Sequence, residues 1–270
     1  MSAQPIWSVF GKPWAGTAPG QLGGWLADRG FQGIEVPVRD GAFVTPERAR
    51  AALPPYVAAL QAHGVRVISV ASDLDESVFA ACAEAGVEVI RVMAPVRDHD
   101  YRGSVALIHR QLSEALPLCE RHGVRIGVQP HHGAYVTSTL GVLQLIDDLP
   151  AEHVTIVWDA AHDALAGDDP VTTLELAWPR LEIVNLKNAH YRAVEGPEGT
   201  SWKPWFGTAH DGMADWGAAL RHLAARGWRG PVCLSAQYSA AADSPERAAE
   251  LVARDLRVAR ALWERPEATP

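Results

Sequence analysis

Eight short runs rich in β-branched and apolar residues recur along this 270-residue chain, with helix-like stretches between them. Such regular alternation places parallel strands in one sheet and helices on its outside. Eight units in a chain of this length predict a (β/α)8 TIM barrel of the α/β class, built as a single domain over residues 1–270. We expect its strands at 6–10, 33–38, 65–71, 87–93, 124–128, 154–158, 181–186 and 232–236.

The expected helix ends support this architecture. Four helical patterns stop at a glycine just before a strand, where a residue free to adopt positive φ ends a helix: Gly30, Gly64, Gly123 and Gly227. The competing architecture is an open, doubly wound sheet. Its first strand–helix turn would carry a GxGxxG motif for a dinucleotide, and the corresponding segment here, FGKPWAG, has none.

Side chains alternate between the two faces of a strand, which divides each expected strand into an apolar and a more polar face. In 181–186, Val184 and Leu186 share one face, whereas Asn185 and the following Lys187 share the other. We expect the apolar faces to pack on helices and the polar residues to point into the barrel at the carboxyl ends of the strands, where such barrels hold their active sites. The inward set is Glu35, Gln129, Asp159, Asn185, Lys187, Ser235 and Gln237.

Net charge, apolar stretches and cysteine content limit the binding partners and the cellular location that we expect. A net charge of −8 disfavours nucleic acid and anionic membranes. No apolar stretch reaches the roughly 18 residues of a membrane span, and the first residues lack the pattern of a signal peptide. An odd number of cysteines, three, builds no disulfide framework. We therefore expect a cytoplasmic protein.

Five strand ends carry a family resemblance that spans nearly the whole chain. The segments are GFQGIEV, GVRIGVQPHHG, VTIVWDAAH, LEIVNLKNAH and RGWRGPVCLSAQY. In this order they resemble the xylose isomerase-like superfamily of sugar isomerases and epimerases. The resemblance implies a (β/α)8 barrel that holds one divalent metal through a Glu, an Asp, a His and a Glu on strands five to eight. It also implies that the two glutamates move the proton, that the substrate is a carbohydrate-like small molecule, and that the chain forms a homo-oligomer.

The sequence matches this pattern only in part. Asp159 and His162 fit the D-x-x-H motif of the sixth strand, Glu35 fits the second-strand glutamate, and His131 fits the histidine after the fifth strand. The remaining positions have lost their charge: Gln129 replaces the first Glu, Asn185 replaces the His, Ser235 or Gln237 replaces the second Glu, and Asn188 replaces the Asp that usually follows Lys187.

These replacements leave one carboxylate among the four metal positions. We therefore expect either no cofactor or a weakly bound Mn, Mg, Co or Zn ion at Asp159, with amide oxygens of Gln129, Asn185 and Gln237 as its other candidate ligands. An amide takes up no proton near neutral pH, so the proton transfer between two glutamates cannot operate unchanged.

Three interpretations remain open. The chain is a metal-poor sugar isomerase, epimerase or lyase, in which His131, His162, Lys187 and Glu35 are the candidate catalytic residues. Alternatively, Asp159 binds a metal together with some of His131, His132, His162 and His210. In the third interpretation the barrel binds a sugar-like ligand without catalysis. A nuclease, as in a DNA-repair branch of the superfamily, is disfavoured by the acidic charge. For Glu35 there is an alternative to a catalytic role: it pairs with Arg91 or Arg125 in an ion pair.

The long connection 190–211 after the seventh strand has the length of a binding loop or lid. Aromatic rings stack on the apolar face of a sugar, which makes its tryptophans, and Trp14 after the first strand, candidate ligand contacts. The only lysines in the chain, Lys12, Lys187 and Lys203, all map to the same end of the barrel, and Lys187 should point inward near Asp159. The substrate-binding candidates are Lys12, Trp14, Gln129, His132, Asn185, Trp202, Lys203, Trp205, His210, Ser235 and Gln237.

Overall fold

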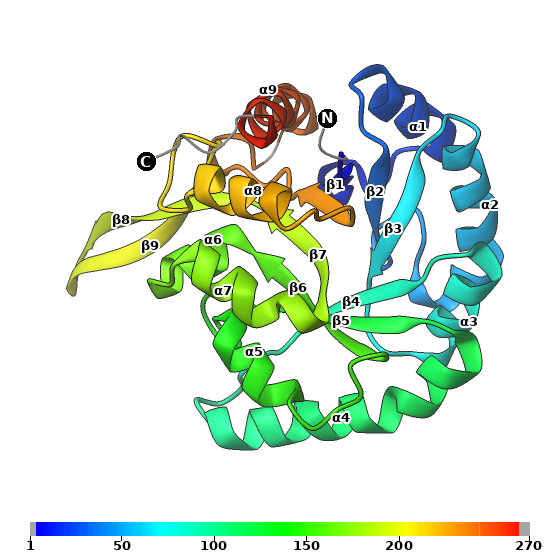
Figure 1. Cartoon of the computed structure of the whole chain (residues 1–270), viewed down its shortest axis with the longest axis horizontal. Helices are drawn as coiled ribbons and strands as arrows, with labels where there is room; N and C mark the ends of the chain where they lie inside the picture. The colour runs from blue at the N-terminus through cyan, green and yellow to red at the C-terminus, as the bar shows by residue number, and fades with distance from the viewer. Residues whose placement is uncertain (1–3, 243, 265–270) are drawn as a thin grey trace.

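The computed structural model describes residues 4–242 and 244–264. Eight parallel strands close into a barrel in the order β1-β10-β7-β6-β5-β4-β3-β2, which confirms the expected (β/α)8 fold (Figure 1). The strands are β1 (Ile6–Phe10), β2 (Gly33–Pro37), β3 (Arg66–Ala71), β4 (Val89–Met93), β5 (Arg125–Gln129), β6 (Val154–Asp159), β7 (Leu181–Leu186) and β10 (Pro231–Leu234).

Helices surround the barrel between consecutive strands. They are α1 (Pro19–Asp28), α2 (Ala49–Gln61), α3 (Glu76–Ala85), α4 (Tyr101–His122), α5 (Thr139–Ile146), α6 (Ala160–Ala166), α7 (Pro170–Ala177), α8 (Trp216–Ala225) and α9 (Pro245–Trp263), with 3-10 turns η1 (Lys12–Trp14), η2 (Pro46–Arg48), η3 (Trp178–Arg180) and η4 (Ser239–Ala241). The four glycines expected at helix ends all have positive φ, between 64° at Gly123 and 81° at Gly30. Within the described residues, no helix is long and apolar enough to cross a membrane.

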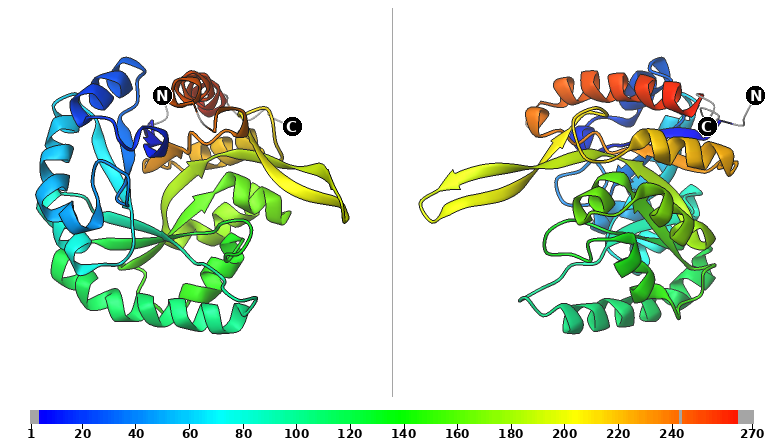
Figure 2. Two further views of the ribbon diagram at one scale, coloured as in Figure 1. Left: turned by 180° about the vertical axis from the view of Figure 1, so that it is seen from behind. Right: turned by 60° about the vertical axis from the view of Figure 1, so that its left-hand side comes forward.

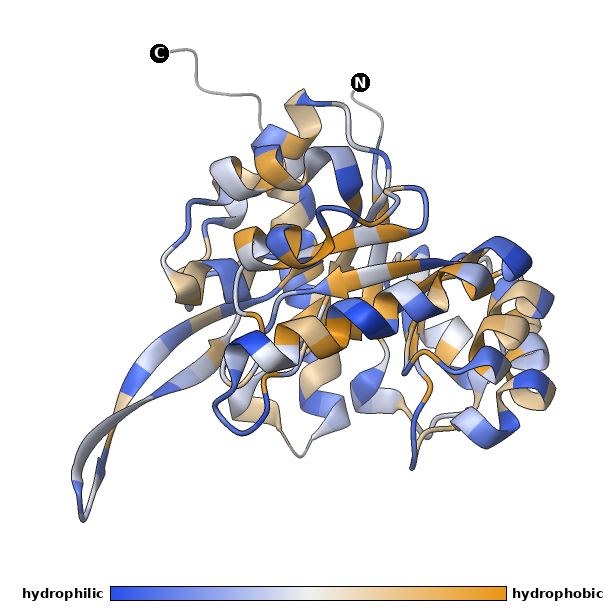
Figure 3. Ribbon diagram, turned by 90° about the horizontal axis from the view of Figure 1, so that it is seen from below, coloured by the Kyte–Doolittle hydropathy of each residue, from blue (hydrophilic) through white to orange (hydrophobic). Residues whose placement is uncertain are grey.

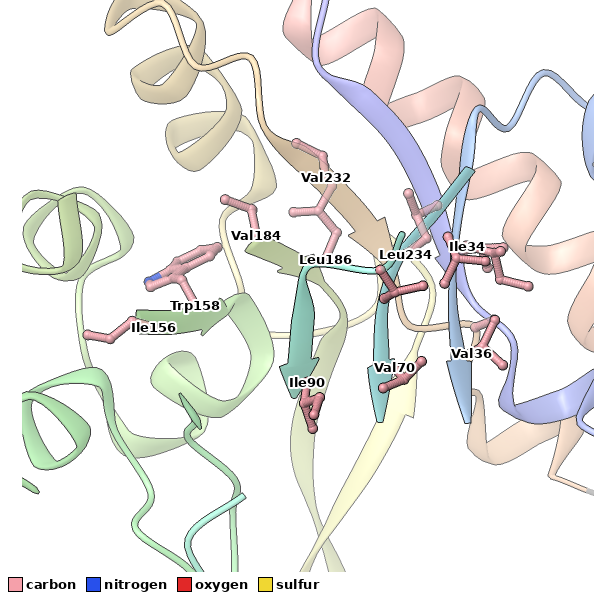
Figure 4. Close-up of a cluster of buried hydrophobic side chains, with 14 of the residues drawn as sticks. Ile34, Val36, Val70, Ile90, Ile156, Trp158, Val184, Leu186, Val232 and Leu234 are labelled. Carbon is pink, nitrogen blue, oxygen red and sulfur yellow. The ribbon is translucent and has the colours of Figure 1, made fainter. Parts of the chain in front are cut away.

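The core divides into two layers, as the alternation of side chains predicted. The outward residues of the strands, among them Ile34, Trp158 and Leu234, pack with the inner faces of the helices in one large buried cluster (Figure 4). A second, smaller cluster fills the inside of the barrel and includes Phe10 and Cys233. Coloured by hydropathy, the strands are mainly apolar and the helices carry polar residues on their outer faces (Figure 3). Burial of both layers supplies most of the driving force for the fold.

The connection after β7 is a β-hairpin. The long connection over 190–211, expected to be a binding loop or lid, consists mainly of β8 (Asn188–Gly196) and β9 (Gly199–Gly207), a two-stranded antiparallel sheet that projects from the barrel (Figure 2). A two-residue turn joins the strands, and Gly199 has φ 108°, a backbone conformation that glycine adopts without steric cost. Most aromatic and charged residues of 190–205 therefore lie along these two strands, which project from the barrel.

Asn188 anchors the base of this hairpin. Its Nδ2 group donates to the carbonyl oxygens of Ala209 and Ala214, at 2.9 and 3.2 Å, and its Oδ1 accepts from the backbone N–H groups of Ala189 and Ala214, at 3.0 and 2.8 Å. A Cβ atom at Gly212 would lie 2.1 Å from Oδ1, so this contact requires glycine there. One buried side chain thus fixes the segment that covers the β7 end of the barrel mouth.

Candidate active site

Asp159 organises the carboxyl end of β6. It is fully buried and is the N-cap of α6: its Oδ1 accepts hydrogen bonds from the backbone N–H groups of Ala161, at 3.0 Å, and His162, at 3.1 Å. Its Oδ2 accepts a hydrogen bond of 2.7 Å from Nε2 of Gln129 on β5. Burial raises the pKa of Asp159, and the charge of Lys187 and these hydrogen bonds oppose that shift.

His162 and Lys187 meet beside this carboxylate. The Nζ atom of Lys187 lies 3.1 Å from Nε2 of His162, which is 3.8 Å from Oδ2 of Asp159. Both side chains are buried. Burial lowers the pKa of each group; the charge of Lys187 adds to the effect on His162, whereas Asp159 opposes the effect on Lys187. Lys187 therefore lies inside the barrel next to Asp159, at a distance from His162 across which a proton can pass.

His131 brings a second imidazole to the site. Its Nδ1 lies 2.9 Å from the carbonyl oxygen of His132, which only accepts hydrogen bonds, so Nδ1 carries the proton and Nε2 a free lone pair. The rings of His131 and His162 have centroids 4.3 Å apart. Burial, followed by the charge of Lys187, lowers the pKa of His131 to about 4. The ring is therefore neutral near pH 7 and able to accept a proton.

Glu35 lies inside the barrel in an ion pair with Arg91. Nη2 of Arg91 lies 2.6 Å from Oε1, Nε of Arg91 lies 3.3 Å from Oε2, and the Ser69 hydroxyl donates to Oε2 at 2.8 Å. Of the two interpretations of Glu35, the structure thus shows the ion pair. Both carboxylate oxygens are engaged, so Glu35 holds Arg91 in place, and its candidate catalytic role stays a prediction.

Two adjoining cavities open at the barrel mouth. A small one of about 70 Å³ lies among the strand ends, and a wider one of about 540 Å³ extends from it towards η4 and the start of α9. Both are lined by Lys12, His131 and Gln237. The small cavity brings together most of the expected inward residues: Gln129, Asn185, Lys187, Ser235 and Gln237.

Other expected site residues lie elsewhere. Trp14 is buried against Trp25, with ring centroids 4.8 Å apart. Trp202 and Lys203 are exposed on β9, with 67% of the Trp202 surface accessible. Trp205 stacks under Arg192 of the same hairpin, at 3.9 Å, and His210 is exposed beyond it. None of these residues lines either of the two cavities, so their assignment to ligand binding stays a prediction.

The structure adds residues that the sequence did not single out. Phe206, at the base of β9, lines the wide cavity, with its ring 4.8 Å from the Lys187 ammonium and 5.3 Å from the His132 ring. Arg39, after β2, and Tyr238, after β10, also line the cavities. Phe206 lies in the connection whose length alone indicated a binding loop, so no separate feature of the sequence indicated its place in the cavity.

The residues at the family's metal positions fit a divalent ion poorly. Asp159 uses both oxygens as hydrogen-bond acceptors, and Gln129 turns its NH2 group, rather than its oxygen, towards Asp159. Nitrogens of His131, His132 and His162 do approach within 4.8 Å of one another. However, both ring nitrogens of His162 already have partners, and one of them is the amino group of Lys187. These residues are therefore better suited to hydrogen bonding and proton transfer than to holding a divalent ion.

Sequence comparison identifies the family. A family model described as xylose isomerase-like TIM barrel matches residues 24–262. The chain belongs to this family. No curated protein matches the chain in sequence.

Solved structures share the fold over almost the whole chain. D-allulose 3-epimerase from Methylomonas sp. superposes with a TM-score of 0.74 at 13% identity, over 97% of this chain and 99% of that one. The 3-keto-D-glucoside 4-epimerase of E. coli gives 0.70 at 16% identity, over 96% and 100%. A probable 3-DHS dehydratase of Bacillus anthracis gives 0.68 at 12% identity, over 93% and 97%. At these identities the likeness concerns the fold.

Proposed function

We propose that this barrel is an enzyme of the isomerase, epimerase or lyase type that removes a proton from a carbon next to a carbonyl group of a carbohydrate-like small molecule. The observation that carries the proposal is the meeting of His131 and Lys187 at one cavity, with His162 and Asp159 behind Lys187. The family membership and the epimerase and dehydratase folds similar to this one support the same class of reaction.

The chain's own residues supply a proton acceptor and a proton donor. His131 accepts the proton from carbon at its free Nε2 atom, since Nδ1 is held by the carbonyl of His132. Lys187, in contact with His162, donates a proton to the carbonyl oxygen as negative charge develops there. Isomerisation then needs the proton on the neighbouring carbon, epimerisation needs it on the opposite face, and elimination needs loss of a hydroxyl group from the next carbon.

Neutral hydrogen-bonding groups hold the polyol part. Oδ1 of Asn185 is buried and has no hydrogen-bond partner among the described residues, which leaves it free for a substrate hydroxyl. Gln237 and Ser235 line the same cavity. A site of this kind recognises the positions of substrate hydroxyl groups through hydrogen-bond donors and acceptors rather than through a metal.

Exchange of hydrogen with solvent tests the proposal. A panel of ketohexoses, aldohexoses and keto acids is incubated with the protein in D2O, and deuterium at the carbon next to the carbonyl is followed by NMR. We expect protein-dependent exchange, a loss of about a hundredfold or more in His131→Gln, and impairment in Lys187→Arg, because a planar guanidinium does not replace a compact amine. His109→Gln, on the outer helix α4, is the matched control and should exchange as wild type. Exchange that persists in both His131→Gln and Lys187→Arg would refute the assignment.

A second candidate is a barrel that binds a sugar-like ligand without turnover. The specific observation in its favour is that the positions of both family glutamates hold uncharged side chains, Gln129 among them. Stabilisation of the protein by a sugar of the panel, with no exchange in D2O for any member, is the result that favours this candidate.

A further inference from the structure

The small cavity at the barrel mouth is lined by basic side chains, and the nearest carboxylate in a neighbouring cavity is that of Asp73, beside Arg39. The small cavity contacts Lys12, Arg39, Arg91 and Lys187, and neither of the two cavities has an Asp or Glu among its lining residues. The chain as a whole carries a net charge of −8, so this local excess of positive charge runs against its composition.

One of these cations is already neutralised. Arg91 makes two hydrogen bonds to Glu35, and both residues are buried. Lys12 and Arg39 differ from Arg91, because within the described part of the chain neither has an ion-pair partner. The Nε–H group of Arg39 is buried and has no hydrogen-bond acceptor among those residues. A buried donor without an acceptor is costly, and it marks a place where a ligand atom belongs.

The two unpaired cations are close enough to repel. Partial burial, followed by the charges of Arg39 and Arg91, lowers the pKa of Lys12. Burial and the charge of Arg91 likewise lower the pKa of Arg39, and the carboxylates of Glu35 and Asp73 oppose this shift only in part. The ring of Phe10 lies 5.8 Å from the Arg39 guanidinium and 4.9 Å from that of Arg91, and all three side chains line the small cavity. A bound anion would reduce the electrostatic repulsion between like charges in such a partly desolvated space.

A neutral polyol would not provide this relief, because its hydroxyl groups accept hydrogen bonds but carry no charge. We propose that Lys12 and Arg39 form an anion subsite that holds a carboxylate or phosphate group of the substrate. The inference rests on the proposed function of the barrel mouth and narrows its substrate to an anionic sugar derivative, such as a sugar acid or a sugar phosphate. Lys12 and His131 line the same two cavities, so one small molecule can contact the subsite and the proton acceptor together.

Binding of a matched pair of polyols tests the subsite. D-Gluconate and D-glucitol differ at one end, where gluconate has a carboxylate and glucitol a hydroxymethyl group; inorganic phosphate is the third probe. Each is titrated into the full-length protein and followed by calorimetry and by thermal unfolding. We expect at least one of the two anions to bind about tenfold or more tightly than glucitol. Preference between gluconate and phosphate then distinguishes a carboxylate from a phosphate ligand.

Charge variants locate the effect. Arg39→Gln should weaken binding of the preferred anion about tenfold or more and leave glucitol binding unchanged. Arg66→Gln removes the same charge at the opposite end of the barrel, where Arg66 is exposed, and should bind as wild type. Should Arg39→Gln fail to fold, Lys12→Gln serves instead, because Lys12 lies in an accessible turn.

Three results would overturn the subsite. They are equal affinity for the anions and glucitol, no binding of either anion, and unchanged anion binding in the Arg39→Gln or Lys12→Gln variant. These are equilibrium measurements, so the subsite can fail while hydrogen exchange in D2O persists. Equally, exchange can be absent while the anion still binds, which separates failure of this inference from failure of the proposed function.

Discussion

The hydrogen bonds of Asp159 predict different costs for two substitutions at this position. Asp159→Ala removes the cap of α6, worth about 1 kcal/mol. It also leaves the buried Gln129 amide without its acceptor, worth about 1–3 kcal/mol. Together the Ala variant should lose about 2–4 kcal/mol of unfolding free energy. Asp159→Asn keeps an oxygen for the cap, and Gln129 can rotate its amide to offer an acceptor to the new NH2 group, so the hydrogen-bond part of its loss should stay below about 1 kcal/mol.

The assay is urea unfolding of both variants near neutral pH. Their unfolding free energies can be compared if the slope of free energy against urea concentration is the same for both. Lys187 loses its neighbouring charge in both variants, so the difference between them isolates the hydrogen bonds. Asp215 caps α8 through one hydrogen bond of 2.8 Å and is exposed. Asp215→Ala should therefore cost only about 1 kcal/mol. Equal destabilisation by Asp159→Asn and Asp159→Ala would refute this reasoning, because the negative charge would then dominate.

Three further substitutions test other parts of the structure. Gln129→Glu places a second carboxylate against Asp159, so this variant should be less stable than wild type without metal and gain stability in Mn²⁺, whereas wild type should not respond. Equal Tm values for the variant with Mn²⁺ and with a chelator would contradict the prediction. Burial raises the pKa of Asp163 to about 6. Its ionisation therefore destabilises the folded state as pH rises, and Asp163→Asn should gain about 3 kcal/mol relative to wild type in urea unfolding between about pH 4 and pH 7; a constant difference over this range is the contrary result. Ala236 has φ 51°, so Ala236→Gly should be neutral or stabilising by about 1 kcal/mol in thermal unfolding. Ala58→Gly, in the middle of α2, should instead cost about 1 kcal/mol, and a similar loss in both variants would argue against strain at Ala236.

The barrel was predictable because its signals are local. Strands β1 (Ile6–Phe10) and β7 (Leu181–Leu186) have the boundaries expected from sequence, and the alternation that placed Val184 outward also placed Lys187 inward. Parity along one strand needs no knowledge of the rest of the chain, only that one face is buried against helices.

The hairpin and the basic cavity were not predictable in this way. Glycines and charged residues in 190–207 suggested a loop, and the pairing of β8 with β9 outside the barrel removed Trp202 and Lys203 from the mouth. Arg39 was not predicted because its place beside Lys12 depends on how the neighbouring strands β1 and β2 pair. Contacts between distant segments decide such features, and a single sequence carries no direct record of them.

The clamp made by Asn188 constrains attempts to convert this site into a metal-binding one. An aspartate usually follows the lysine in this family, but an ionised carboxylate has no hydrogen to offer the carbonyl oxygens of Ala209 and Ala214, which Asn188 now satisfies. Reverting position 188 would therefore unsettle the base of the hairpin before any metal could compensate. Position 188 and the family's metal-ligand positions therefore depend on one another. A metal site could be restored here only by changing the junction between β7 and the hairpin together with the ligand positions.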